Sequence, residues 1–142
     1  LPISGAGVGL NAAVRIAEDR RVAGGGDVLP EAGAALVAEA GYREGDEVSD
    51  NQRLSGLAGT DLPERLRADG ITTLLVTGVA TNLTVEQTAR HGTDLGFTVH
   101  VVSDCVTAPT PEIGEASLAN LDLATAGVLT SADALRIIEE RG

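Results

Sequence analysis

The fold of this chain is decided by one stretch near its middle, Leu74-Leu75-Val76-Thr77-Gly78-Val79-Ala80-Thr81-Asn82-Leu83-Thr84-Val85-Glu86-Gln87-Thr88-Ala89-Arg90. It starts as a short apolar run with β-branched residues, which is typical of a buried strand. Gly78 interrupts that run, and Thr81 and Asn82 are residue types that often begin a helix. The stretch therefore predicts a strand, a tight turn and a helix. In open α/β folds such a turn lies at the carboxyl edge of the sheet, where ligands bind.

The rest of the chain predicts further helices and strands around this unit. Apolar residues at helical spacing favour a helix from Leu10 to about Arg20, and Pro30 suits the first turn of a second short helix. From residue 46 onward, strands and helices are expected to alternate. Strands are predicted at 47–50, 71–77, 97–102 and 127–129, and helices at 60–68, 82–94, 112–124 and 131–141, with Thr60 and Ser131 as caps.

This alternation indicates the class of fold. Strands that alternate with helices form a mainly parallel sheet through right-handed crossovers. We therefore expect a three-layer α/β/α architecture of the Rossmann-like type. The length of 142 residues fits a single domain that spans the chain.

The composition excludes several classes of partner. The formal net charge is −11, from 10 basic and 21 acidic residues, so the chain lacks the basic footprint that nucleic acids and anionic membranes require. No apolar run approaches the roughly 20 residues of a membrane span. Cys105 is the one cysteine, so an internal disulfide cannot form. That fits a reducing compartment, and we expect a cytoplasmic protein.

The central stretch also carries a resemblance to a known family. The segment from Gly78 to Arg90 is similar to the nucleophile segment of the isochorismatase-like hydrolases, the superfamily of nicotinamidase and N-carbamoylsarcosine amidohydrolase. Further segments follow the family's order and spacing, so the resemblance covers roughly residues 30 to 142. These segments are Glu44–Val48, Leu54–Leu62, Leu66–Ile71, Asp94–Phe97 and Val101–Asp104.

The resemblance implies a particular site. In this family the turn contains a cis peptide bond, which would fall at Val79-Ala80 here. The backbone N–H groups of Ala80 and Thr84 would then form an oxyanion hole. Amidase members carry a cysteine nucleophile at the position of Thr84, and the counterpart of the family's catalytic lysine is Asn51. The family's aspartate ends a first apolar strand near the N-terminus, and this sequence shows no equivalent of that strand.

These departures change the expected chemistry. A threonine hydroxyl needs an adjacent base before it can act as a nucleophile, so Thr84 is also interpreted as a helix-start residue that bonds local backbone. Asn51 can donate a hydrogen bond, but it cannot hold a positive charge. The residues therefore argue against hydrolysis of the cysteine type.

Three hypotheses follow for the function. The first is a hydrolase of this family that acts on a small amide or vinyl-ether substrate without a cysteine nucleophile. The second is a catalytically degenerate relative that keeps the fold for binding or assembly. The third is that the sequence is incomplete and that a fuller gene product supplies the first strand, with the N-terminal part truncated or remodelled here.

Other residues that carry chemistry give weaker patterns. Cys105 follows Asp104 at a predicted strand end, where it is interpreted either as a displaced nucleophile or as a small buried apolar residue. His91 and His100 lack metal-ligand spacing, and Gly24-Gly25-Gly26 lacks the context of a phosphate loop. Neither a metal nor a cofactor is expected.

The missing first strand has a consequence for assembly. An unpaired sheet edge must be covered or paired. We therefore expect a homo-oligomer in which a second copy covers that edge.

Overall fold

The computed structural model describes residues 12–16, 47–51 and 53–141. In chain order the elements are β1 (Ala12–Ile16), β2 (Glu47–Asn51), α1 (Leu62–Ala68), β3 (Thr73–Val79), the π-helical turn η3 (Thr81–Val85), α2 (Glu86–Asp94), β4 (Thr98–Thr107), α3 (Pro111–Ala124), β5 (Val128–Leu129) and α4 (Ser131–Arg141). Strands and helices alternate from β3 onward, as the sequence predicts.

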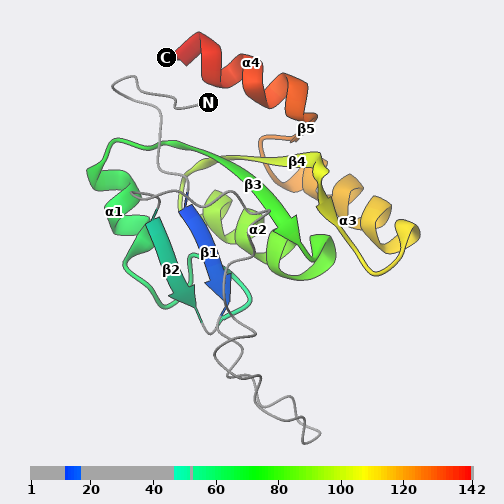
Figure 1. Cartoon of the computed structure of the whole chain (residues 1–142), viewed down its shortest axis with the longest axis horizontal. Helices are drawn as coiled ribbons and strands as arrows, with labels where there is room; N and C mark the ends of the chain where they lie inside the picture. Colours follow the sequence, from blue (N-terminus) through cyan, green and yellow to red (C-terminus); the bar gives the residue numbers. More distant parts are fainter. Residues whose placement is uncertain (1–11, 17–46, 52, 142) are drawn as a thin grey trace, which may run out of the picture.

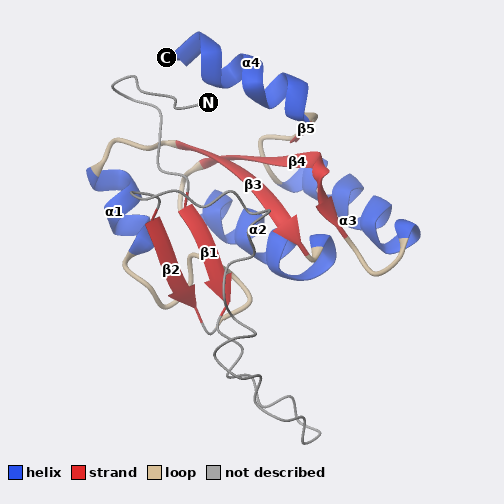
Figure 2. Ribbon diagram, viewed as in Figure 1, coloured by secondary structure: helices blue, strands red, loops and turns tan. Residues whose placement is uncertain are grey.

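The strands form two parallel groups. β1 pairs with β2, while β3, β4 and β5 form a three-stranded sheet in that order, and every described pairing is parallel. In Figure 1 the arrowheads of β1, β2 and β3 point toward the same edge of the molecule. Figure 2 shows helices packed along the three-stranded sheet, an arrangement that confirms the α/β class. A parallel sheet presents its carboxyl ends together, and that edge is where the central turn lies.

The helix predicted from Leu10 to Arg20 is wrong, because residues 12–16 form strand β1. Ala12, Val14 and Ile16 alternate with other residues at the period of a strand, and valine and isoleucine favour extended backbone. This short run fits either spacing, and its pairing with β2 selects the strand: Ala12 lies opposite Glu47 and Ile16 opposite Asn51. The short helix predicted after Pro30 lies outside the described residues.

β4 extends five residues beyond its predicted end at Val102. The pairing of β3 with β4 is regular as far as Val76 opposite Val101 and resumes with Gly78 opposite Val106. The register shift is an irregularity in the pairing, and β4 continues beyond it as far as Thr107. β4 therefore places Ser103, Asp104 and Cys105 within the strand rather than after it.

The start of α4 is capped differently from the prediction. The hydroxyl of Thr130 accepts the Asp133 N–H at 3.2 Å and donates to Asp133 Oδ2 at 2.7 Å, so Thr130 is the capping residue. The N–H and the hydroxyl of Ser131 instead bond the carboxylate of Asp104 at 2.7 and 2.6 Å. These two bonds fasten α4 to β4. None of the helices in the described part of the chain is both long and apolar enough to cross a bilayer.

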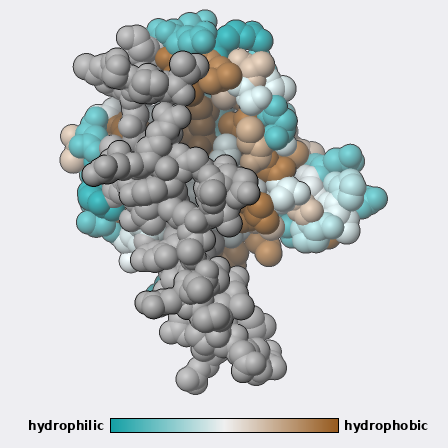
Figure 3. Space-filling view, viewed as in Figure 1, coloured by the Kyte–Doolittle hydropathy of each residue, from teal (hydrophilic) through white to brown (hydrophobic). Residues whose placement is uncertain are grey.

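Several large apolar side chains lie on the surface rather than in the core. Figure 3 shows hydrophobic surface at the carboxyl end of β3. Val79 and Leu83 come from this region and are 70% and 50% exposed. Among the residues that the structure describes, the other exposed large apolar side chains are on α3 and α4: Ile113, Leu123 and Leu135.

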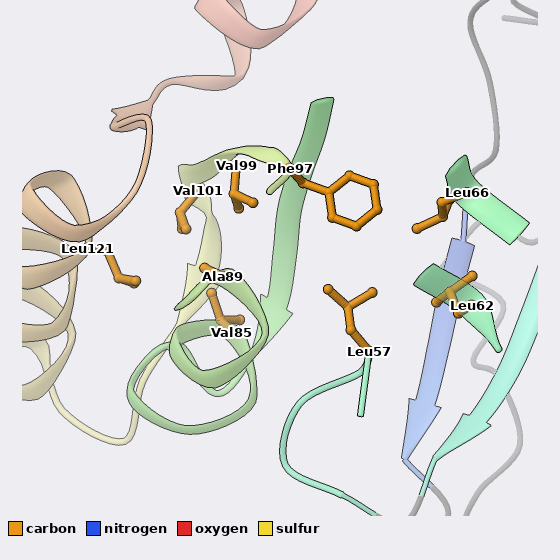
Figure 4. Packing of buried hydrophobic residues seen from close by; sticks show 9 residues of the cluster. All are labelled: Leu57, Leu62, Leu66, Val85, Ala89, Phe97, Val99, Val101 and Leu121. Carbon is orange, nitrogen blue, oxygen red and sulfur yellow. The ribbon is translucent and has the colours of Figure 1, made fainter. Parts of the chain in front are cut away.

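The core joins the three-stranded sheet to α1, α2 and α3. Val99 and Val101 of β4, Ala89 of α2 and Leu121 of α3 are each fully buried. Figure 4 shows Leu121 reaching from α3 toward Val101 and Val85. The whole buried cluster contains Leu57, Leu62, Leu66, Val85, Ala89, Phe97, Val99, Val101 and Leu121. It is aliphatic apart from one phenylalanine, and it holds α2 firmly against the sheet behind the central turn.

Candidate functional site

The central turn joins β3 to α2 through a short π-helical segment. The Val79–Ala80 peptide bond is cis. Ala80 has extended backbone angles, and its carbonyl accepts hydrogen bonds from Leu83 N at 3.1 Å and Val85 N at 3.2 Å. Single-turn π-helical segments are rare and occur often at functional sites. The turn and the helix start predicted from the sequence are therefore present, with a wider first turn than an α-helix has.

The predicted capping by Thr81 and Asn82 is wrong. Ala80 precedes the first turn, and no side chain caps it. Thr81 is buried inside the segment. Within the described residues, Asn82 Oδ1 is buried without a hydrogen-bond partner.

Thr84 lies in the middle of the π-helical segment and is half-buried. Its hydroxyl makes no hydrogen bond to another described residue, so no described base activates it. The interpretation of Thr84 as a residue that bonds local backbone gains no support from these contacts. Val79, just before the turn, and Leu83, next to Thr84 in the sequence, have exposed apolar side chains.

Asn51, the counterpart of the family's lysine, is the last residue of β2. Its strand ends at the edge of the molecule where β3 also ends (Figure 1). The loop that follows β2 is bonded to α2, because Gly56 N donates to Thr88 Oγ1 at 2.9 Å and Ser55 Oγ lies 2.9 Å from His91 Nδ1. Thr88 and His91 lie one helical turn apart on α2, so the face of α2 that carries them points toward the loop after β2.

Glu86 forms a hydrogen-bond network that sequence reasoning missed. Its Oε1 accepts from Arg90 Nη2 at 2.9 Å and its Oε2 accepts from Ser117 Oγ at 2.5 Å. Ser117 belongs to α3 and is buried. The sequence contained one signal of this network, which was Ser117 itself. Ser117 lies one helical turn before Leu121 on the core-facing side of α3, where a polar side chain needs a hydrogen-bond partner.

The remaining candidate residues are dispersed. Cys105 is exposed, so its interpretation as a buried apolar residue is wrong. Asp104 beside it has its pKa lowered by the Ser131 hydroxyl and then by the Ser131 N–H. His100 Nδ1 lies 3.3 Å from the Gly127 carbonyl. In the parts of the chain that are described, no three histidine, cysteine or acidic residues gather closely enough to hold a metal ion.

Comparison with known proteins identifies the class. The sequence model of the Isochorismatase domain family matches residues 12–133, and the chain belongs to that family. Its fold is shared with an isochorismatase-like hydrolase from Alkaliphilus metalliredigens, with a TM-score of 0.80 and 28% identity over 89% of this chain and 70% of that protein. A putative hydrolase of the family from Chromobacterium violaceum gives a TM-score of 0.79 and 31% identity over 91% and 72% of the two chains.

Curated relatives give the same family with smaller coverage. The uncharacterized isochorismatase family protein YwoC of Bacillus subtilis is 35% identical over 100 residues, which cover 70% of this chain and 53% of YwoC. The ureidoacrylate amidohydrolase RutB of Methylobacterium radiotolerans is 36% identical over 104 residues, which cover 66% of this chain and 40% of RutB. The chain thus spans about half or less of the length of these two relatives.

Proposed function

We propose that this chain is a hydrolase that acts on a small amide or vinyl-ether substrate at the Val79–Thr84 turn, without a cysteine nucleophile. The observation that carries the proposal is the turn itself, which lies at the carboxyl end of β3 and leads directly into a helix. Backbone N–H groups at a helix start stabilise negative charge. Membership of a hydrolase family and the similarity to an amidohydrolase of ureidoacrylate support this assignment.

We infer a non-covalent route, because the Thr84 hydroxyl has no hydrogen-bond partner among the described residues. Hydrolysis of an amide begins when water adds to the carbonyl carbon and the carbonyl oxygen becomes an oxyanion. N–H groups of Ala80 and Thr84 are the donors for that oxyanion, and each such donor is worth roughly 3 kcal/mol in the transition state. The attacking water gives up one proton, and the departing amine takes up one proton as the carbon–nitrogen bond breaks, so no net proton is consumed. The Thr84 hydroxyl, with no described base beside it, stays out of bond formation.

Turnover with trapping of intermediates tests this proposal. The purified protein is incubated with a panel of primary amides, ureido compounds and isochorismate, and release of ammonia or loss of isochorismate is followed. Samples are quenched in acid during turnover, and the mass of the intact protein is measured by mass spectrometry. We expect turnover without an added acyl mass. An acyl adduct on the protein would refute the non-covalent route, and the absence of turnover with every substrate would refute the hydrolase.

Thr84→Val separates the roles of the hydroxyl and the backbone. Valine has nearly the same shape and keeps the N–H group, but it removes the hydroxyl. A loss of roughly a thousand-fold or more in kcat would identify the hydroxyl as a nucleophile. The matched control is Thr130→Val, which removes a hydroxyl from the start of α4.

The proposal includes a homo-oligomer in the cytoplasm. Within the described residues, the strands form a two-stranded and a three-stranded group, and a second copy could extend either group by edge pairing. Leu123 and Leu135, at 88% and 55% exposure, offer apolar surface for a second copy. Sedimentation velocity over a hundred-fold range of protein concentration tests the oligomer, and a monomer throughout would contradict it.

Cell fractionation tests the cytoplasmic location. The single cysteine, Cys105, favours that location.

A further inference from the structure

The carboxylate of Glu86 connects the end of the π-helical turn to two other helical positions. Glu86 is the first residue of α2 and directly follows η3. Its Oε1 accepts from both Nε and Nη2 of Arg90, at 3.1 and 2.9 Å. Its Oε2 accepts from the hydroxyl of Ser117, at 2.5 Å, across to α3. The Glu86 side chain is 22% exposed against 41% for Arg90, so the carboxylate faces inward and the guanidinium shields it.

Ser117 contacts the start of the π-helical turn and the residue that follows its end. Its hydroxyl lies 2.5 Å from Glu86 Oε2, just after the turn, and 3.3 Å from the carbonyl oxygen of Thr81, the first residue of the turn. A hydroxyl has one hydrogen, so the two acceptors share it: the contact to the charged Glu86 carboxylate is the stronger branch and the contact to the Thr81 carbonyl the weaker one. The single hydroxyl therefore contacts the first residue of the five-residue segment that contains Thr84 and the side chain of the residue that follows the segment.

Other contacts also hold the turn in place. A π-helical turn is a local departure from the α-helix, and it persists where surrounding groups stabilise it. The Ala80 carbonyl accepts two N–H groups from inside the turn, at Leu83 and Val85. Buried Thr81 and Val85 anchor its two ends in the core. The Ser117 hydroxyl adds a polar contact from α3 to the Thr81 carbonyl and to the Glu86 side chain.

We propose that Ser117 and Glu86 are positioning residues that hold the Thr81–Val85 turn, and with it the N–H group of Thr84, in the geometry used for hydrolysis. Neither residue touches the substrate. They act through the backbone of the turn, and Arg90 acts by holding the second carboxylate oxygen. This inference rests on the proposed function for its effect on catalysis, whereas the restraint on the turn is independent of it.

Two variants and a matched control test the restraint directly. Ser117→Ala removes the hydroxyl and places a strong helix former in α3, and Glu86→Ala removes the carboxylate. Thr130→Val is the control, because it removes another hydroxyl that donates to a carboxylate, at 2.7 Å from Asp133, on α4. Circular dichroism and urea unfolding establish that each variant is folded.

Amide hydrogen exchange is measured at residues 81–85 in each variant. We expect Ser117→Ala and Glu86→Ala to raise these exchange rates at least tenfold relative to the amides of β4. Glu86→Gln, which keeps an acceptor oxygen, should give a smaller increase, and Thr130→Val should give none at these residues. Unchanged exchange at residues 81–85 in both alanine variants would overturn the proposal, whether or not a substrate has been found.

Steady-state kinetics with a substrate that the protein hydrolyses test the consequence for catalysis. A positioning role predicts that kcat falls about ten- to a hundred-fold while KM changes by less than threefold, because the oxyanion forms only in the transition state. The double variant should lose no more than the worse single variant, since both residues act through one contact. Faster exchange with unchanged kcat would overturn the catalytic part of the proposal alone.

Discussion

Leu121→Ala tests how the core supports the central turn. Leu121 is fully buried on α3, one helical turn after Ser117, and it packs in the cluster that contains Val85 and Val101 (Figure 4). The substitution removes three carbon atoms from this cluster. At about 0.8 kcal/mol for each buried group, the lost transfer free energy is roughly 2.4 kcal/mol. A residual cavity adds to it, within the range of about 2 to 5 kcal/mol known for such changes.

Leu123→Ala is the matched control, because it makes the same chemical change two residues further along the same helix. Leu123 is 88% exposed, so we expect a change within about 0.5 kcal/mol in the free energy of unfolding. Both variants are unfolded in urea at low and high protein concentration. The slope of the free energy of unfolding against urea concentration is compared between the variants, because equal slopes show that unfolding exposes the same amount of surface. The melting temperature of Leu121→Ala should fall by roughly 10 °C.

The two variants also separate packing within the chain from packing between copies. If Leu121→Ala cost no more than Leu123→Ala, the assignment of Leu121 to the core would be refuted. A loss of stability in Leu123→Ala that grows with protein concentration would place Leu123 in an interface between copies.

Three further predictions concern other parts of the molecule. Ser55→Ala leaves buried partners unpaired beside His91 and should lower the free energy of unfolding by about 1–3 kcal/mol in a urea titration. The pKa of Asp104 is lowered by hydrogen bonds from the first residue of α4, so its carboxylate stabilises the fold above pH 3.8 and less as the pH falls below that value. Asp104→Asn should therefore flatten the acid limb of a stability–pH curve, and an unaltered limb would count against this capping. A Cβ atom at Gly92 would lie 3.0 Å from Val99 Cγ2, so Gly92→Val should destabilise the protein by about 1–3 kcal/mol, measured by thermal unfolding.

Much of the fold could be predicted from local patterns. The alternation of strands and helices after residue 46, the end of β3 near Gly78 and the helix after it all follow from turn residues and apolar periodicity. Strand β1 could not be predicted in the same way. Its five residues satisfy two periodicities, and the choice depends on pairing with β2, more than thirty positions later in the sequence.

The candidate site could likewise be predicted only in part. The turn at Val79 and Ala80 and the position of Thr84 at the start of a helix follow from the sequence and its resemblance. The hydrogen bond from Ser117 to Glu86 joins residues on different helices, separated by 31 positions, so no local pattern specifies it. The ion pair of Arg90 could not be predicted from sequence spacing either. Asp94 and Glu86 both lie four residues from it, and the structure pairs it with Glu86, which Ser117 already holds in place.

The measurement that tests the account most directly is a two-dimensional NMR titration of the ¹⁵N-labelled protein with the amides and isochorismate used for turnover. It reports where a ligand binds without requiring catalysis. The account predicts that the largest shifts in amide resonances fall within residues 79–86, with smaller shifts at Ser117. Shifts centred on α4 or on the opposite end of the sheet, with residues 79–86 unchanged, would contradict the assignment of the Val79–Thr84 turn as the functional site.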